Sequence, residues 1–255
     1  MIFLETIAVA VGCALVAVGA HYVVQRRFDA DMLAEHNEVA GYIYSAVAVT
    51  YAVVLGFVVV SAWEKYGQVQ NYVSAEASAV LNLDHTVGAL PQPQRRRIRT
   101  GLLRYAHEVV EKEWPEMRNG TLALSAGGQL DGVAREIESF APNCPGEQDA
   151  HLTALDEMRR IFDARRDRIL ASQRSVPPIL WLALIAGAIA TLGFTFLFGV
   201  RNRGVQLLMT GVLAALIGIM FVVINEFDTP FQGANSIAPT GWLYLEERAS
   251  TMELQ

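Results

Sequence analysis

The chain has 255 residues, of which 53% are hydrophobic and only 18% are charged. Soluble proteins carry about 25% charged residues on average, so this composition argues against a purely soluble protein, and its apolar content excludes an intrinsically disordered one. The formal net charge of −6 argues against nucleic-acid binding through bulk charge. The two cysteines are too few for a disulfide-stapled fold or a multi-cysteine zinc site.

The apolar residues are concentrated in four long stretches that hold almost no charge. These stretches are 3–24, 39–63, 179–200 and 205–225. Each is long enough for a helix to cross a bilayer, which takes about 20 apolar residues. The first stretch resembles a signal peptide in length, but no basic residue precedes it and Arg26 and Arg27 follow it, which favours a retained helix. The sequence therefore predicts an all-α integral membrane protein with four transmembrane helices, two before and two after a long polar insert.

The same stretches divide the chain into four expected segments. These are transmembrane helices 1 and 2 in 1–63, a polar insert in 64–178, transmembrane helices 3 and 4 in 179–225, and a C-terminal tail in 226–255. The insert contains no clear alternation of apolar and polar residues, so we expect it to be helical. Because four spans are an even number, both termini and the insert are expected on one face of the membrane. Lysine and arginine residues near the span ends are slightly more numerous on the side of the insert, which favours the cytoplasm for the insert and both termini.

Helical spacing predicts that the first and last helices of the insert are continuous with transmembrane helices. Apolar positions continue past Trp63 to about Leu90, so the second transmembrane helix is expected to extend into the insert. A second helix is expected over 95–114 and to end at Pro115. An amphipathic helix over 149–174 is expected to lead into the third span. Its arginine run at 159–168 is interpreted as a solvated helix face, with binding to acidic lipid as the alternative.

Signals of catalysis are absent from the sequence. It has no phosphate-binding loop, no dinucleotide fingerprint and no nucleophile elbow, and no two histidines stand at the spacing of metal ligands. We therefore expect no catalytic residue, no metal site and no cofactor, and the chain is not expected to be an enzyme.

The second apolar stretch is the most informative one. It carries hydroxyl groups among its apolar residues, which a lipid-facing helix has little use for, so the helix is expected to pack inside a bundle or to line a passage. Val49, Val53 and Phe57 are four residues apart and share one face of this helix. From the spacing alone, helix packing and a pore lining both remain open for these three residues.

Two motifs resemble the bestrophin channels. Val54-Leu55-Gly56-Phe57 and the following Ser61-Ala62-Trp63-Glu64-Lys65-Tyr66 resemble the second-helix motif of bestrophins, and the Asn-Glu-Phe-Asp-Thr-Pro-Phe-Gln-Gly segment at 225–233 resembles the segment after their last transmembrane helix. The layout of spans and the Glu113-Trp114-Pro115 step also fit. The chain is identified as a member of the bestrophin-like membrane family of bacteria and plants. The residues that the resemblance marks as structural motif positions are Gly56, Trp63, Glu64, Tyr66, Glu226, Asp228, Pro230, Phe231 and Gly233.

This resemblance implies an oligomeric ion channel. Bestrophins are pentameric anion channels with cytoplasmic termini and a cytoplasmic helical insert. The expected partners are therefore the lipid bilayer, small ions such as chloride, and further copies of the chain, with a pentamer as the expected assembly. The expected location is a bacterial inner membrane, with the termini and 64–178 in the cytoplasm. The resemblance also places Val49, Val53 and Phe57 near the hydrophobic neck of the pore.

An alternative is a non-conducting membrane scaffold or sensor that binds a partner through its helical insert.

One departure from the family pattern concerns calcium. Acidic residues follow the Pro-Phe-Gly step in calcium-gated bestrophins, whereas Ala234, Asn235 and Ser236 follow Gly233 here. Because Ca²⁺ takes 6–8 oxygen ligands, we expect no calcium gating.

Overall fold

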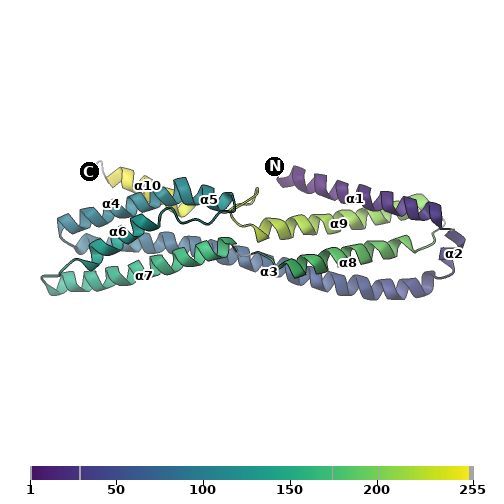
Figure 1. The fold of residues 1–255 in the computed structure, drawn as a ribbon, viewed down its shortest axis with the longest axis horizontal. Coiled ribbons are helices and arrows are strands. Elements are labelled where there is room, and N and C mark those ends of the chain that lie inside the picture. The colour runs from purple at the N-terminus through teal and green to yellow at the C-terminus, as the bar shows by residue number, and fades with distance from the viewer. Residues whose placement is uncertain (1, 29, 174, 201, 253–255) are drawn as a thin grey trace. The chain divides into compact units, whose positions relative to one another are not determined.

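The structure is a computed structural model that describes residues 2–28, 30–173, 175–200 and 202–252 (Figure 1). Within these ranges the chain forms helices and no strand, which confirms the predicted all-α fold. Four helices in this part of the chain are long and apolar enough to cross a membrane, as expected. Position 174, where a helix was expected to end, and positions 253–255 of the expected tail lie outside the described residues.

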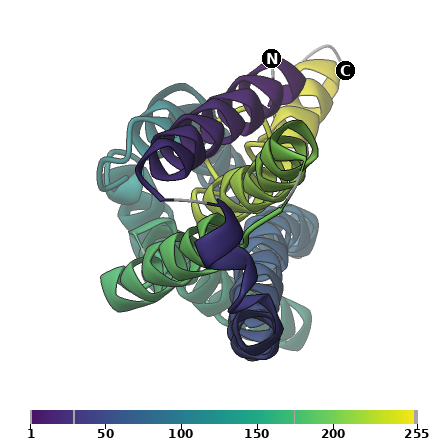
Figure 2. The ribbon, with the colours of Figure 1, turned by 90° about the vertical axis from the view of Figure 1, so that its right-hand side faces the viewer.

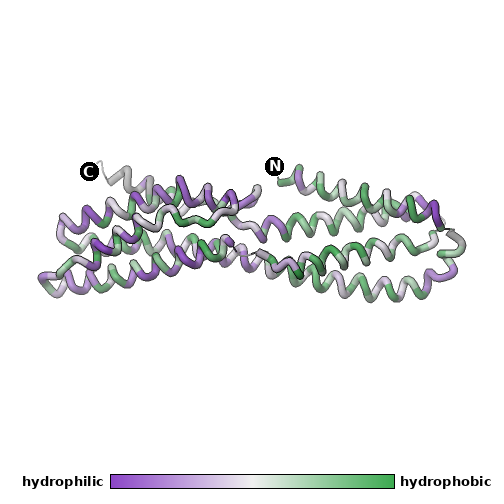
Figure 3. Tube along the Cα trace, in the orientation of Figure 1, coloured by the Kyte–Doolittle hydropathy of each residue, from purple (hydrophilic) through white to green (hydrophobic). Residues whose placement is uncertain are grey.

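The chain divides into two compact units. Met1–Lys65 and Ser175–Asp228 form the first, called here the spanning unit, and Tyr66–Arg174 and Thr229–Gln255 form the second, called here the insert unit. Most of the expected C-terminal tail therefore shares a unit with the polar insert. Figure 3 shows the difference in composition, since apolar residues dominate the helices of the spanning unit and alternate with hydrophilic residues in the insert unit.

The spanning unit contains the four apolar helices. They are α1 (Ile2–Arg27), the first half of α3 (Asn37–Thr86), α8 (Pro178–Phe196) and α9 (Arg203–Asp228), with the short α2 (Ala30–Ala34) between α1 and α3. Helices α1 and α9 lie side by side (Figure 2). Small residues allow this approach, because a Cβ atom on Gly218 of α9 would lie 3.0 Å from the Sγ atom of Cys13 on α1.

One face of α3 packs against α8 and α9 and forms the core of the spanning unit. The buried members of this core are Tyr51, Val58, Ala62, Val176, Leu184, Ala188, Ile217 and Ile224. Helix α3 then continues to Thr86, which agrees with the expected extension of the second span into the insert.

The insert unit is built from the second half of α3 and a set of shorter helices. These are the 3₁₀ helix η1 (Val87–Ala89), α4 (Gln92–Glu108), the π-helical segment η2 (Val109–Glu113), α5 (Trp114–Arg118), α6 (Gly127–Glu138), α7 (Pro145–Gln173) and α10 (Thr240–Met252). Apolar side chains from these helices form a continuous core.

The expectation that Pro115 ends the preceding helix is wrong. Helix α4 passes through the π-helical segment η2 into α5, and Pro115 lies in the first turn of α5. Within a continuous helix a proline removes one backbone hydrogen bond, and its ring crowds the carbonyl of the residue four positions before it. The π-helical segment adjusts the backbone before Pro115 so that the chain stays helical to Arg118.

Candidate functional site

Val49, Val53 and Phe57 lie on an exposed face of α3 in the spanning unit. Their side chains are 64%, 52% and 72% exposed. With 3.6 residues per turn, this face is opposite to the one that buries Tyr51 and Val58 in the core. The three residues therefore lie outside both apolar cores of the described chain, and their face is open to lipid, to water or to another copy.

Hydroxyl groups share this exposed face of α3. The Ser45 hydroxyl donates a hydrogen bond to the carbonyl of Gly41 at 2.8 Å, and the Thr50 hydroxyl donates one to the carbonyl of Ala46 at 2.8 Å. Both side chains remain exposed. Because the backbone of the same helix satisfies both hydroxyl donors, this face suits contact with water as well as contact with lipid tails. We call the exposed positions 45, 49, 50, 53 and 57 the open face of α3.

The motif residues that follow on α3 have different surroundings. Gly56 faces open space, and the side chains of Trp63 and Glu64 are exposed. Tyr66, at the start of the insert unit, donates a hydrogen bond to the carbonyl of Asn235 at 2.9 Å. Partial burial raises the pKa of the Tyr66 hydroxyl, which favours the neutral donor.

Asp228 ties three segments of the spanning unit together. Its Oδ1 atom accepts hydrogen bonds from the Lys65 ammonium at 2.8 Å and from the backbone N–H of Val176 at 2.7 Å. Lys65 also donates to the backbone carbonyl of Asp228 at 2.7 Å. Asp228 is buried and Glu226 is partly buried. The end of α9, the middle of α3 and the segment before α8 are thus joined by one carboxylate.

The remaining motif residues meet in the insert unit. Phe231 packs edge-on against Trp114 with ring centroids 5.7 Å apart, and the Trp114 indole donates a hydrogen bond to the carbonyl of Ile237 at 3.0 Å. Pro230, which precedes Phe231, is also buried. Gly233 has a φ of +74°, which glycine adopts without strain. The fold therefore brings together the Glu113-Trp114-Pro115 step and the motif after α9, which are far apart in the sequence.

A buried ion network in the insert unit was missed by the sequence analysis. The Arg168 guanidinium donates to Glu76 at 2.5 Å and to Glu113 at 2.7 Å, and Arg165 donates to Glu113 at 2.8 Å. The Tyr105 hydroxyl donates to Glu76. All five side chains are buried, and the two carboxylates balance the two guanidinium groups. The backbone N–H of Ala126 gives Glu113 a further hydrogen bond at 3.0 Å.

The network favours the charged forms of Glu113, Arg165 and Arg168. Burial of Glu113 opposes its ionisation, but hydrogen bonds and charge from Arg165 and Arg168 outweigh burial and lower the Glu113 pKa. Burial likewise opposes the charge on Arg168, and Glu76 outweighs it and raises the Arg168 pKa. Burial and the charge of Glu76 raise the pKa of Tyr105 well above its usual value, which keeps the hydroxyl neutral and donating.

The interpretation of the arginine run at 159–168 as a solvated face is therefore wrong for Arg165 and Arg168. Arg166 between them is exposed and pairs with Asp163 at 2.5 Å. A signal was present in the sequence, since Arg165 and Arg168 continue the helical spacing of the buried Met158 and Ile161.

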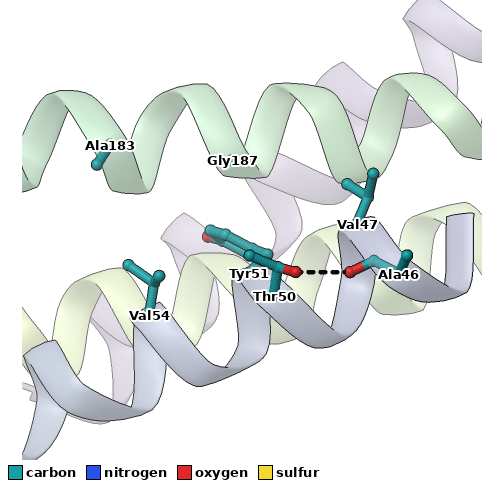
Figure 4. A pocket seen from close by; sticks show the side chains of 7 residues that line it. All are labelled: Ala46, Val47, Thr50, Tyr51, Val54, Ala183 and Gly187. Carbon is teal, nitrogen blue, oxygen red and sulfur yellow. Dashed lines mark hydrogen bonds between the residues drawn. The ribbon is translucent and has the colours of Figure 1, made fainter. Parts of the chain in front are cut away.

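The packing of Tyr51 on α8 gives a testable prediction (Figure 4). A Cβ atom on Gly187 would overlap the Tyr51 ring, so Gly187→Ala is expected to lower the free energy of unfolding by about 1–3 kcal/mol. Thermal unfolding of the purified protein in detergent measures this effect. Gly193→Ala in the same helix meets open space and is the matched control. Equal unfolding temperatures for the two variants would contradict the described packing.

These features define an all-helical integral membrane protein whose apolar helices lie in a lipid bilayer. The sequence model of the Bestrophin-like domain matches residues 11–242, and the chain belongs to this family. Membership in a family of channels supports an ion channel as the general function. None of the curated proteins matches the chain.

Solved structures of bestrophin homologues share the fold. A bacterial Bestrophin homolog from Klebsiella pneumoniae has a TM-score of 0.68 at 12% identity, with 99% of both chains covered. A mutant of that homolog has a TM-score of 0.70 at 14% identity, again with 99% of both chains covered. At this level of identity the similarity concerns the fold alone.

Proposed function

We propose that copies of this chain assemble around a central axis and form an anion channel whose pore is lined by the open face of α3. The observation that carries this proposal is the exposure of Val49, Val53 and Phe57 on a face that also holds hydroxyl groups. Family membership supports ion conduction in general. One set of four spans is too few to enclose a pore, so an assembly is required, and the resemblance to bestrophins favours a pentamer.

Val49, Val53 and Phe57 form the neck of the proposed pore. Rings of such apolar side chains around an axis expel water from a narrow passage and close it to ions. Glu64 and Trp63 then lie at the end of the neck where α3 leaves the membrane. The termini and the insert lie in the cytoplasm under this proposal, and the chain is located in a bacterial inner membrane.

Planar-bilayer recording of the purified protein tests the proposal. Under a KCl gradient, we expect a conductance whose reversal potential lies near the chloride equilibrium potential. Phe57→Ala and Val53→Ala widen the neck and are expected to raise the conductance by about twofold or more.

Matched controls lie on helices outside the proposed pore. Val212 on α9 is 53% exposed, close to the 52% of Val53, and Phe3 on α1 is exposed like Phe57. Val212→Ala and Phe3→Ala are expected to leave the conductance unchanged. A monomer or dimer without conductance, or equal effects of neck and control variants, would overturn the pore and favour the scaffold or sensor alternative. A reversal potential near that of potassium would overturn anion selectivity alone.

A further inference from the structure

A polar groove of about 390 Å³ lies between α3 and α7 in the insert unit. Small residues on both helices leave this space open, namely Ala75 and Ala79 on α3 and Ala164 on α7. The other side chains that line the groove are polar or charged. They are Tyr72, Ser78 and Asn82 on α3, and Glu157, Arg160, Asp163 and Asp167 on α7.

Glu157 is a buried residue of the groove whose carboxylate is not fully hydrogen-bonded. It is 8% exposed, and its Oε2 atom accepts no hydrogen bond from any residue that the structure describes. Its Oε1 atom lies 3.6 Å from Arg160, which is beyond hydrogen-bond distance, and Arg160 also pairs with Asp156 at 3.0 Å. A buried carboxylate oxygen without a donor is unfavourable, so the groove lacks a hydrogen-bond donor at this point.

The net negative charge of the groove indicates that a cation supplies the missing hydrogen-bond donor. Three carboxylates face one guanidinium among the lining residues, which leaves an excess of two negative charges. Asp163 is partly balanced by Arg166 outside the groove. Glu157 and Asp167 lie ten residues apart on α7, which corresponds to about 15 Å along the helix.

This spacing suits an extended organic cation better than a metal ion. Among the described residues, no three histidine, cysteine, aspartate or glutamate side chains converge on one point where a metal ion would be held. A linear polyamine carries ammonium donors at both ends and an alkyl chain between them. Its ends match the separated carboxylates, and its alkyl chain matches the alanine residues of the groove. We propose that this groove binds linear polyamines, with Glu157 and Asp167 each receiving an ammonium group.

Titration of the purified full-length protein with spermidine tests this proposal. By isothermal titration calorimetry at low ionic strength, we expect saturable binding that added NaCl weakens. Putrescine has fewer charges and is expected to bind less tightly. Glu157→Gln keeps the size of the side chain and is expected to weaken spermidine binding by about tenfold. Mg²⁺ is expected not to displace spermidine.

Two further variants separate binding from folding. Ala164→Leu leaves the charge unchanged and fills the groove, so it is expected to abolish binding, while Glu138→Gln on the exposed face of α6 is expected to leave binding unchanged. All variants must unfold at the temperature of the parent protein. Three results would overturn the proposal. Spermidine binding would fail to saturate, Glu157→Gln would bind spermidine as tightly as the parent protein, or Mg²⁺ at equal charge would displace spermidine. None of these outcomes depends on whether the protein conducts ions.

Discussion

Replacing Arg168 with methionine is expected to lower the free energy of unfolding by about 3–5 kcal/mol. The substitution leaves Glu76 without its guanidinium partner and removes one of the two from Glu113, while both carboxylates stay buried. Methionine fills most of the arginine volume, so the loss reports the unpaired charge and not a cavity. Thermal and chemical unfolding of the purified protein in detergent, followed by circular dichroism, measures the change.

Arg166→Met is the matched control for this prediction. Arg166 lies on the same helix, is exposed, and pairs with Asp163 at the surface, so its loss is expected to change the free energy of unfolding by at most about 1 kcal/mol. Adding Glu76→Gln to the Arg168 variant is expected to cost less than the sum of the single changes, because the two residues are coupled. Equal unfolding temperatures for the Arg166 and Arg168 variants would show that the network does not stabilise the insert unit.

Replacing Asp228 with alanine is expected to lower the free energy of unfolding by about 3 kcal/mol. The reason is that the buried backbone N–H of Val176 loses its acceptor, and the partly buried Lys65 ammonium loses its carboxylate partner and keeps the backbone carbonyl of residue 228. The change also removes the carboxylate that joins α3 and α9 to the segment before α8. Thermal unfolding of the full chain in detergent measures the effect.

Asp228→Asn distinguishes the hydrogen bonds from the charge. Its amide oxygen still accepts from Val176, so the loss is expected to be about half that of Asp228→Ala. Asp156→Ala, which removes an exposed ion pair with Arg160, is the surface control and is expected to have little effect. If Asp228→Asn destabilises as much as Asp228→Ala, the ion pair with Lys65 dominates and the bond to Val176 contributes little.

The sequence by itself determined the elements that depend on local information. A run of about 20 apolar residues without charge is sufficient to identify a membrane-crossing helix, because a bilayer accepts such a segment whatever its neighbours are. The continued spacing after Trp63 predicted an extension to about Leu90, and α3 extends to Thr86 and is followed by η1 to Ala89. The bestrophin-like family was also identified from short motifs, which the match over residues 11–242 confirms.

Only the tertiary structure decided which side chains meet. Helical spacing shows that Arg165 and Arg168 share a face, but it does not show that Glu76 and Glu113, distant in the sequence, supply the carboxylates that allow this face to be buried. The same limit applies to Phe231 and Trp114, whose contact depends on the path of the whole chain. The limit is strongest for α3, because apolar residues suit a core, a lipid surface and a pore neck equally well. Only the packing of α8 and α9 against α3 shows which face of α3 one chain leaves open.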